Sequence, residues 1–319
     1  MTDLQTTPDA PRGPQRAQPS PEVHAEGVLL DEREGLAVVS RSFGRQTWDR
    51  FRRHKLAIIA IVLLVLLVAL FWLGPMFSEF GVTQTSADLR QGPSLRHPFG
   101  TDTIGRDLFV RTLTGGRFSI IIAVTVSLLT TVIGTLLGAL AGYFRGALDT
   151  MIDGLTNLVL IMPAIVILLV VAPRFGQRPF AIAVLLALLL WPQIARVVRG
   201  LFLQFKEQEF VLAARAAGAR APRIMFRHIL PNTMGPIIVN ATLLVGIAII
   251  LESTLSFLGA GITPPTPTLG NLVHEAKGSI ETKPSAVFIP GGFIVAITLC
   301  INFLGDGLRD ALDPTTRRA

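Results

Sequence analysis

Residues 206–231 read KEQEFVLAARAAGARAPRIMFRHILP, and they decide the fold because this charged stretch separates two strongly apolar runs. The pattern predicts two short helices joined at Gly218, since glycine commonly ends a helix. Pro222 suits the first turn of the second helix, and Pro231 is expected to end it. Two interpretations fit the stretch: an amphipathic segment that lies on a membrane surface, or a surface that another protein approaches.

The charges within this stretch follow the order that helices favour. Glu207 and Glu209 fall at the start of the first predicted helix and Arg215 falls near its end, in agreement with the helix dipole. Arg223 and Arg227 are four residues apart, so they share one face of the second helix. The alanines between these charges give a smooth surface that a partner backbone is able to approach closely.

Composition places the chain in a membrane. Of 319 residues, 50% are hydrophobic and only 16% are charged, whereas a soluble domain carries about 25% charged residues. The mean hydropathy is +0.55. The net charge of +7 does not indicate nucleic-acid binding, because the basic residues mostly flank apolar runs and act as topology signals. The single cysteine, Cys300, excludes a disulfide within the chain and a cysteine metal cluster.

Apolar runs long enough to cross a bilayer occur six times. The predicted spans are 56–73, 118–144, 150–172, 180–198, 234–258 and 286–304. These runs are continuous rather than alternating, so helices are expected instead of barrel strands. We therefore predict an all-α integral membrane protein with six transmembrane helices, in which a cytoplasmic loop with two short helices connects spans four and five.

Basic residues also predict the orientation of the spans. A cluster of positive charge at residues 41–55 precedes the first span, which favours a cytoplasmic N-terminus. From Arg41 onward, 17 Lys and Arg residues fall in segments placed inside and 9 in segments placed outside. Both termini are therefore expected in the cytoplasm. A cleavable signal peptide is the competing interpretation of the first run, but a long tail precedes it and no small-residue cleavage site follows.

The chain is expected to divide into four segments. Residues 1–40 are rich in Pro, Gln and Ala without apolar periodicity, which predicts a disordered cytoplasmic tail. Residues 41–116 hold the first span and an extracytoplasmic loop, residues 117–314 form a core of five spans, and residues 315–319 are a C-terminal tail.

Small residues and prolines indicate that the middle spans do more than hold the protein in the membrane. Gly134, Gly138 and Gly142 recur every fourth residue, which predicts a stripe for close helix packing. Pro163 lies in the middle of the third span and Pro192 lies late in the fourth. Either proline is able to kink its helix and open a cavity.

Polar side chains inside the spans are candidates for a translocation path. These residues are Asp153, Asn157, Asn240 and Glu252. Ionisable groups within a membrane are costly and therefore suggest function. Asp153 has an alternative as an interfacial residue, because it lies about one turn inside the boundary. Glu252 has an alternative as a structural partner of a neighbouring helix, and asparagines in spans commonly form hydrogen bonds between helices.

Motifs for catalysis or nucleotide binding are missing from the sequence. The five histidines show no metal-ligand spacing, and neither HExxH nor GxSxG occurs. Residues 100–107 read GTDTIGRD, which differs from a phosphate-binding loop because Arg106 replaces the lysine and Asp107 replaces the Ser or Thr. An acidic group there repels phosphate. The chain is thus not expected to hydrolyse ATP or to hold a metal.

Four stretches resemble one family of transport proteins. Residues 206–231 resemble the cytoplasmic loop of ABC-importer permeases, with Ala213, Ala214 and Gly218 in place and Leu212 where the family has Glu. Three other stretches are similar to the dipeptide/oligopeptide/nickel branch, C-type subunit. They are HPFGTDTIGRDLFVRTLTGGRFSI (97–120), ESTLSFLGAGITPPTPTLGN (252–271, with Leu269 where Trp is common) and GDGLRDALDP (305–314). The resemblance covers residues 44–314.

The resemblance implies a permease subunit of an ATP-driven peptide importer in the bacterial cytoplasmic membrane. It implies a homologous B-type permease, two ATPase subunits that hold ATP and Mg, and an extracytoplasmic solute-binding protein, in addition to membrane lipid. Segments 97–117 and 259–284 are candidates for docking the solute-binding protein, and plain connecting loops are the alternative. The expected ATPase-coupling residues are Glu209, Ala213, Ala214, Arg215, Gly218, Arg223 and Arg227.

Other functions stay open from the sequence. A stand-alone secondary transporter or channel would use Glu252 and Asp153 as ion-coupling groups, although the two halves show no convincing repeat. Within the resembled branch, nickel chelates, glutathione and haem-like solutes are alternatives to peptides as cargo.

Overall fold

The computed structural model describes residues 43–175 and 178–312, so the predicted tails at 1–40 and 315–319 lie outside the described residues. The chain divides into two units, Met1–Gln46 and Thr47–Ala319, and the arrangement given below is that of the second. The regular elements of the described residues are helices. They are α2 (Phe43–Phe51), α3 (Lys55–Leu73), η1 (Gly74–Phe77), α4 (Leu108–Phe144), α5 (Gly146–Ile161), α6 (Ala164–Phe175), α7 (Pro179–Phe205), α8 (Glu209–Ala216), α9 (Ala221–Arg223), η2 (Ile224–Ile229), α10 (Leu230–Phe257), α11 (Leu269–Ala276), η3 (Lys277–Ser279) and α12 (Ser285–Leu312).

Five helical stretches of the described residues are long and apolar enough to cross a membrane. They contain α3, α4, α7, α10 and α12, and the bent pair α5 and α6 raises the number to six if it forms one span. The predicted kink at Pro163 is present in the third span, where α5 and α6 meet at 91°. Pro163 lies at this break, where its ring and missing N–H prevent a regular helix. Pro192, in contrast, is buried inside α7, which continues through it.

Close packing of α4 against α7 confirms the predicted glycine stripe. A methyl group at Gly138 would lie 2.4 Å from the carbonyl oxygen of Ala195. Methyl groups at Gly134 and Gly142 would lie 2.7 Å from the nearest atoms of α7. Larger side chains would push the two helices apart, so the small residues allow the backbones to approach as closely as they do.

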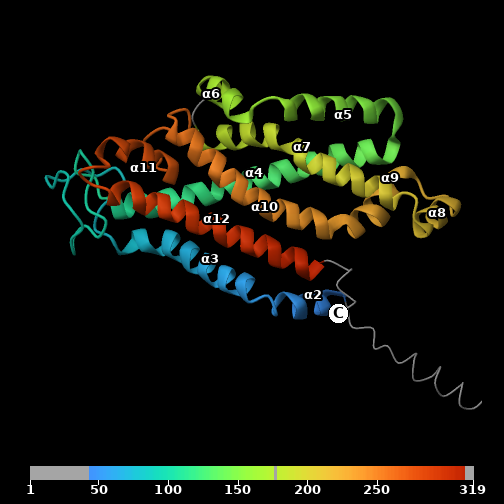
Figure 1. The fold of residues 1–319 in the computed structure, drawn as a ribbon, viewed down its shortest axis with the longest axis horizontal. Helices are drawn as coiled ribbons and strands as arrows, with labels where there is room; N and C mark the ends of the chain where they lie inside the picture. The colour runs from blue at the N-terminus through green and yellow to red at the C-terminus, as the bar shows by residue number, and fades with distance from the viewer. Residues whose placement is uncertain (1–42, 176–177, 313–319) are drawn as a thin grey trace, which may run out of the picture. The chain divides into compact units, whose positions relative to one another are not determined.

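The connections collect at two opposite ends of the helices. In Figure 1, α8 and α9 lie at one end, and α11 lies at the other beside the segment that connects η1 to α4. One expectation about these connections was wrong. Pro231 does not end a helix, because α9, η2 and α10 form one helical stretch, Ala221–Phe257, in which Pro231 follows the π-helical segment η2. The connection from α10 to α12 contains the helix α11 as well as turns.

Candidate functional site

The 206–231 loop folds against the helices along one face only. Its buried residues are Val211, Ile224, Met225 and Ile229, all part of the main hydrophobic core. Gly218 ends the turn after α8 with a φ of +82°, a conformation that most side chains resist. The backbone N–H of Gly218 donates to the carbonyl oxygen of Arg215 at 3.0 Å, which closes the end of α8. The predicted break at Gly218 is therefore present, and it places α8 and α9 on one surface.

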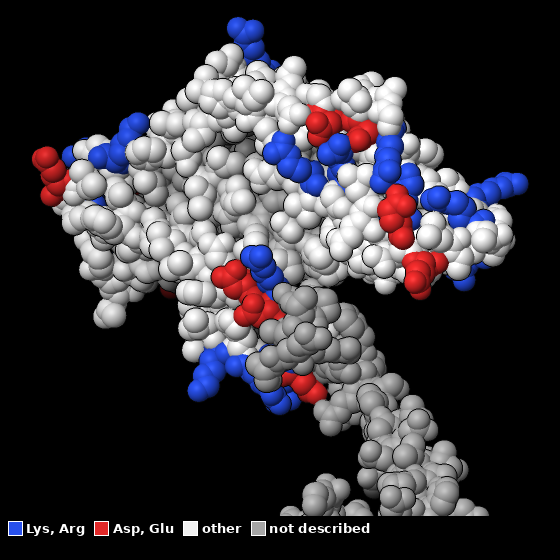
Figure 2. All heavy atoms as spheres, turned by 45° about the vertical axis from the view of Figure 1, so that its right-hand side comes forward, with Lys and Arg blue, Asp and Glu red and all other residues white. Residues whose placement is uncertain are grey.

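The opposite face of the loop is open. Of the seven predicted coupling residues, Ala214 is half-buried and the other six are exposed. No described residue forms an ion pair or hydrogen bond with the side chains of Glu209, Arg215, Arg223 or Arg227. Figure 2 shows charged side chains gathered toward the end of the molecule that carries this loop, beside a broad uncharged surface.

Exposed aromatic side chains on this face were missed from the sequence, and Leu212, noted there only as a departure from the family pattern, adds apolar surface to them. Phe210 is 40% exposed, Leu212 is 45% exposed and Phe226 is 54% exposed. The aromatic residues between the charges could have indicated a binding surface in the sequence. A loop that contacts only water gains nothing from exposed aromatic side chains. The open face thus combines charge with apolar surface, as protein interfaces do.

Charged contacts fix the root of the loop to the end of α4. The ammonium of Lys206 donates to the carbonyl oxygen of Tyr143 at 2.5 Å and lies 5.2 Å from the ring centre of the same residue. Arg145 pairs with Glu207 at 3.0 Å. Burial lowers the pKa of Lys206, and the positive charges of Arg145 and Arg215 lower it further. The start of the loop is therefore anchored, while its outer face is free.

A polar ladder joins α5 to α7 and contains two of the predicted path residues. Asp149 accepts two hydrogen bonds from Arg199, at 2.6 and 2.9 Å. Asp153 lies 3.5 Å from the same guanidinium and accepts from Asn157 at 3.1 Å. Arg196 donates to the Asn157 carbonyl oxygen at 2.8 Å. The sequence interpretation missed Asp149, Arg196 and Arg199, although the spacing of four residues from 149 to 153 to 157 was a signal for one helix face.

The other two predicted path residues do not join this ladder. Asn240 donates its side-chain N–H to the carbonyl oxygen of Pro236 in its own helix at 2.8 Å. Glu252 is fully buried and accepts hydrogen bonds from Ser256 at 2.8 Å and from Ser119 of α4 at 3.3 Å. These contacts favour the structural alternative at Glu252, because its carboxylate links two helices.

A network of ion pairs forms a second polar region at the opposite end, which we call the cap (residues 85–111 and 269–283). Arg106 and Arg111 each contact both Asp102 and Glu275, at distances from 2.6 to 2.9 Å. Burial alone would raise the pKa of Asp102, but hydrogen bonds from the Arg106 backbone and side chain and the Ile104 N–H bring it below its usual value. The cap draws together segments that are more than 160 residues apart in sequence.

Metal-binding clusters are not found among residues 43–175 and 178–312, since no three His, Cys, Asp or Glu side chains there are placed to hold an ion. The geometry is that of a helical membrane protein with one open loop and one self-contained cap.

Comparisons with known proteins agree with this architecture. The model of a family described as "binding-protein-dependent transport system inner membrane component" matches residues 134–318, and that of the "N-terminal TM domain of oligopeptide transport permease C" matches residues 42–93. Relatives named oligopeptide transport system permease protein OppC are 41% identical in Escherichia coli K12 (86% of this chain, 93% of the relative) and 37% identical in Bacillus subtilis 168 (89% and 94%). An inward-facing structure of the MetNI methionine ABC transporter matches the fold with a TM-score of 0.52 and 20% identity, over 62% of this chain and 94% of that one.

Proposed function

The chain belongs to the family of inner membrane components of binding-protein-dependent transport systems, and from this premise we propose that it is the C-type permease subunit of an ATP-driven peptide importer. One observation carries the proposal. Relatives named for oligopeptide transport match nearly the whole chain, and the family match at 134–318 includes the 206–231 loop. The exposed and unpaired face of that loop supports a role in docking a partner.

The proposed complex divides the work among several subunits. Two ATPase subunits hold ATP and Mg and bind the open face of the 206–231 loop. A homologous B-type permease completes the path through the membrane, and a solute-binding protein docks at the cap. Both termini of this chain lie in the cytoplasm, on the same side as the loop, and lipid surrounds the apolar outer surface.

Movement of the loop is the proposed energy input. The loop follows α7 directly, and α9 and η2 lead into α10 without a break, so a displacement of the loop is transmitted to both helices. Rigid-body rotation of such helices switches access from one side to the other. Asp153 and Asn157 of the polar ladder, together with Asn240, are proposed to line the path, while Glu252 stabilises the contact between α4 and α10.

Reconstitution tests this function. Liposomes that contain the chain with its B-type partner and two ATPase subunits should accumulate a radiolabelled tripeptide only when ATP and the solute-binding protein are supplied. Liposomes without the ATPase subunits are the matched control and should accumulate none. Uptake in that control would indicate a stand-alone secondary transporter. A preference for a nickel chelate, glutathione or haem over the tripeptide would reject peptides as cargo while keeping the importer.

A further inference from the structure

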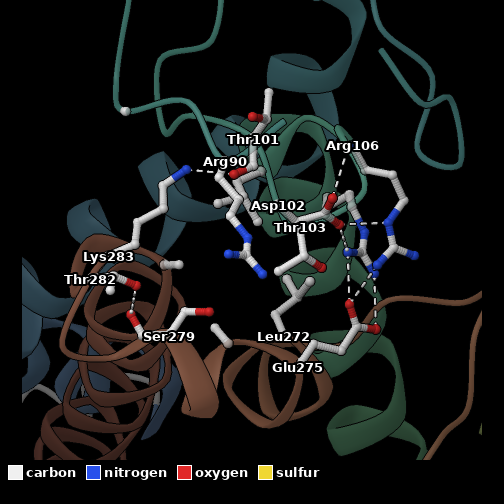
Figure 3. A pocket seen from close by; sticks show the side chains of 15 residues that line it. Arg90, Thr101, Asp102, Thr103, Arg106, Leu272, Glu275, Ser279, Thr282 and Lys283 are labelled. Carbon is white, nitrogen blue, oxygen red and sulfur yellow. Dashed lines mark hydrogen bonds and ion pairs between the residues drawn. The ribbon is translucent and has the colours of Figure 1, made fainter. Parts of the chain in front are cut away.

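A cavity of about 260 Å³ opens between the cap and the start of α12. Its walls come from the segment before α4, from the first turn of α4, from α11 and from the start of α12. A single water needs only ~10–15 Å³ on such a measure, so the cavity is large enough for a small organic molecule. Figure 3 shows Arg90, Thr103, Ser279 and Lys283 arranged around this space.

Positive charge in the cavity exceeds negative charge. Arg106 and Arg111 are balanced by Asp102 and Glu275, with which they form the ion pairs of the cap. Arg90 and Lys283 then supply two further cations, for which the cavity lining holds no additional carboxylate. The ammonium of Lys283 donates to the backbone carbonyl oxygens of Gln91 and Thr101, which fix its position without neutralising its charge.

Arg90 is the group best placed to meet a ligand. Its guanidinium has no ion-pair or hydrogen-bond partner among the described residues, and Figure 3 shows it directed into the cavity. The backbone of Arg90 has a φ of 53°, which is unusual for a residue other than glycine, and its N–H donates to the carbonyl oxygen of Asp102 at 3.0 Å. Backbone strain of this kind concentrates at sites that clamp ligands.

The remaining wall is apolar. Leu108 and Leu272 are buried side chains that face the cavity, and Ala276 and Ala286 continue this surface. A bare inorganic anion would leave this wall without contacts. We propose that the cap cavity binds a small organic molecule that carries a carboxylate, with the guanidinium fork of Arg90 on the carboxylate and the apolar wall on its hydrocarbon part. A guanidinium matches a carboxylate with two parallel hydrogen bonds. The site is separate from the proposed import activity, since it would exist whatever the cargo is.

The test uses the full chain in lipid nanodiscs and L-alanyl-L-alanine as the probe, with binding followed by saturation-transfer NMR. The C-terminal amide of the same dipeptide lacks the carboxylate charge and should bind at least about tenfold more weakly, equivalent to about 1.4 kcal/mol. Arg90→Gln should weaken binding of the free acid by a similar factor. Arg96→Gln is the matched control, because Arg96 is an exposed residue of the same segment that pairs with Asp88 and does not line the cavity.

A second variant tests whether the ligand occupies the cavity itself, independently of the charge of Arg90. Thr103 is an exposed residue of the cavity lining, so Thr103→Trp fills the space without replacing a buried contact and should abolish binding. Equal affinity for the acid and its amide, or unchanged binding in both Arg90→Gln and Thr103→Trp, would overturn the proposal. Displacement of the dipeptide by an equal concentration of inorganic phosphate would overturn the assignment to carboxylates. If the dipeptide does not bind and Arg90→Gln weakens only the solute-binding protein, the cavity receives an acidic side chain of that protein and the proposal fails.

Discussion

The cap and the 206–231 loop lie at opposite ends of the described helices (Figure 1). They differ in whether their charged side chains have ion-pair partners within the chain. In the cap, Arg106 and Arg111 each contact two carboxylates of the same chain. In the loop, Arg223 and Arg227 find no carboxylate among the described residues. The cap is also held by backbone hydrogen bonds such as Ser86 to Gly105 at 2.9 Å.

This difference indicates which surface is complete and which one needs a partner. A region that pairs its own charges is stabilised before any other protein arrives, and mutation there should act first on stability. The 206–231 loop has one buried face and one open face whose charges are unpaired. Its fold is therefore stabilised by the buried face alone. Mutation of the open face should therefore act on association and leave the free energy of unfolding nearly unchanged.

Removal of Arg111 should have the largest effect on stability. Arg111 is only 2% exposed, and Arg111→Gln would leave Asp102 and Glu275 without one of their two cations. Breaking a buried ion pair costs about 3 kcal/mol or more. Thermal unfolding in nanodiscs, compared with that of Arg96→Gln as an exposed control, measures this cost. A loss no greater than that of the control would show that the cap does not depend on its ion pairs.

The membrane helices and the loop were largely predictable, because both depend on local patterns. Long apolar runs, the glycine stripe in α4 and the break at Gly218 each follow from residues close together in the chain. The 91° bend was only half predicted, since Pro163 marks where a helix breaks but does not fix the angle.

The cap was not predictable from the sequence. Its ion pairs join Arg106 and Arg111 to Glu275 across more than 160 residues, and no local pattern indicates which distant charges meet. The same holds for the polar ladder, where Asp149 of α5 meets Arg199 of α7. Single polar residues were noticed in the sequence, but their partners depend on tertiary packing.

Low pH should destabilise the cap through protonation of Asp102, and this loss of stability should be smaller than that caused by Arg111→Gln. The pKa of Asp102 in the folded chain lies below the ordinary value of 3.8, so its contribution to stability is present above pH 3.8 and is lost as the pH falls through the folded pKa. Asp102→Asn should cost about 1.5–3 kcal/mol at neutral pH, since it weakens charge-assisted hydrogen bonds. The gap in melting temperature between wild type and variant should narrow below pH 3.8, and a constant gap would contradict this assignment.

Two substitutions at Gly218 should separate backbone strain from bulk on the open face. A Cβ atom added there meets no atom within 4 Å, but the φ of +82° disfavours most residues. Gly218→Val should cost about 1–2 kcal/mol, whereas Gly218→Asn should cost less because asparagine tolerates the left-handed conformation.

Both variants add bulk where a partner is proposed to dock. We expect each to uncouple ATP hydrolysis from peptide uptake in reconstituted liposomes, and Gly200→Ala, at another open position without positive φ, should not. Normal uptake with Gly218→Asn would indicate that the turn, and not the surface, is what the loop contributes.

The smallest effect is expected at Leu212, where the resembled family pattern has Glu. Leu212 is 45% exposed on α8, so Leu212→Glu should change the free energy of unfolding by less than about 0.5 kcal/mol. If the docking contact is made by the neighbouring alanines, Gly218 and the existing charges, ATP-dependent uptake should also change by less than about twofold, or about 0.4 kcal/mol. Leu212→Gln adds polarity without charge and serves as the control. A large gain in uptake with Glu but not with Gln would show that an acidic group at 212 is itself a contact, and the open face would then need its charge as well as its shape.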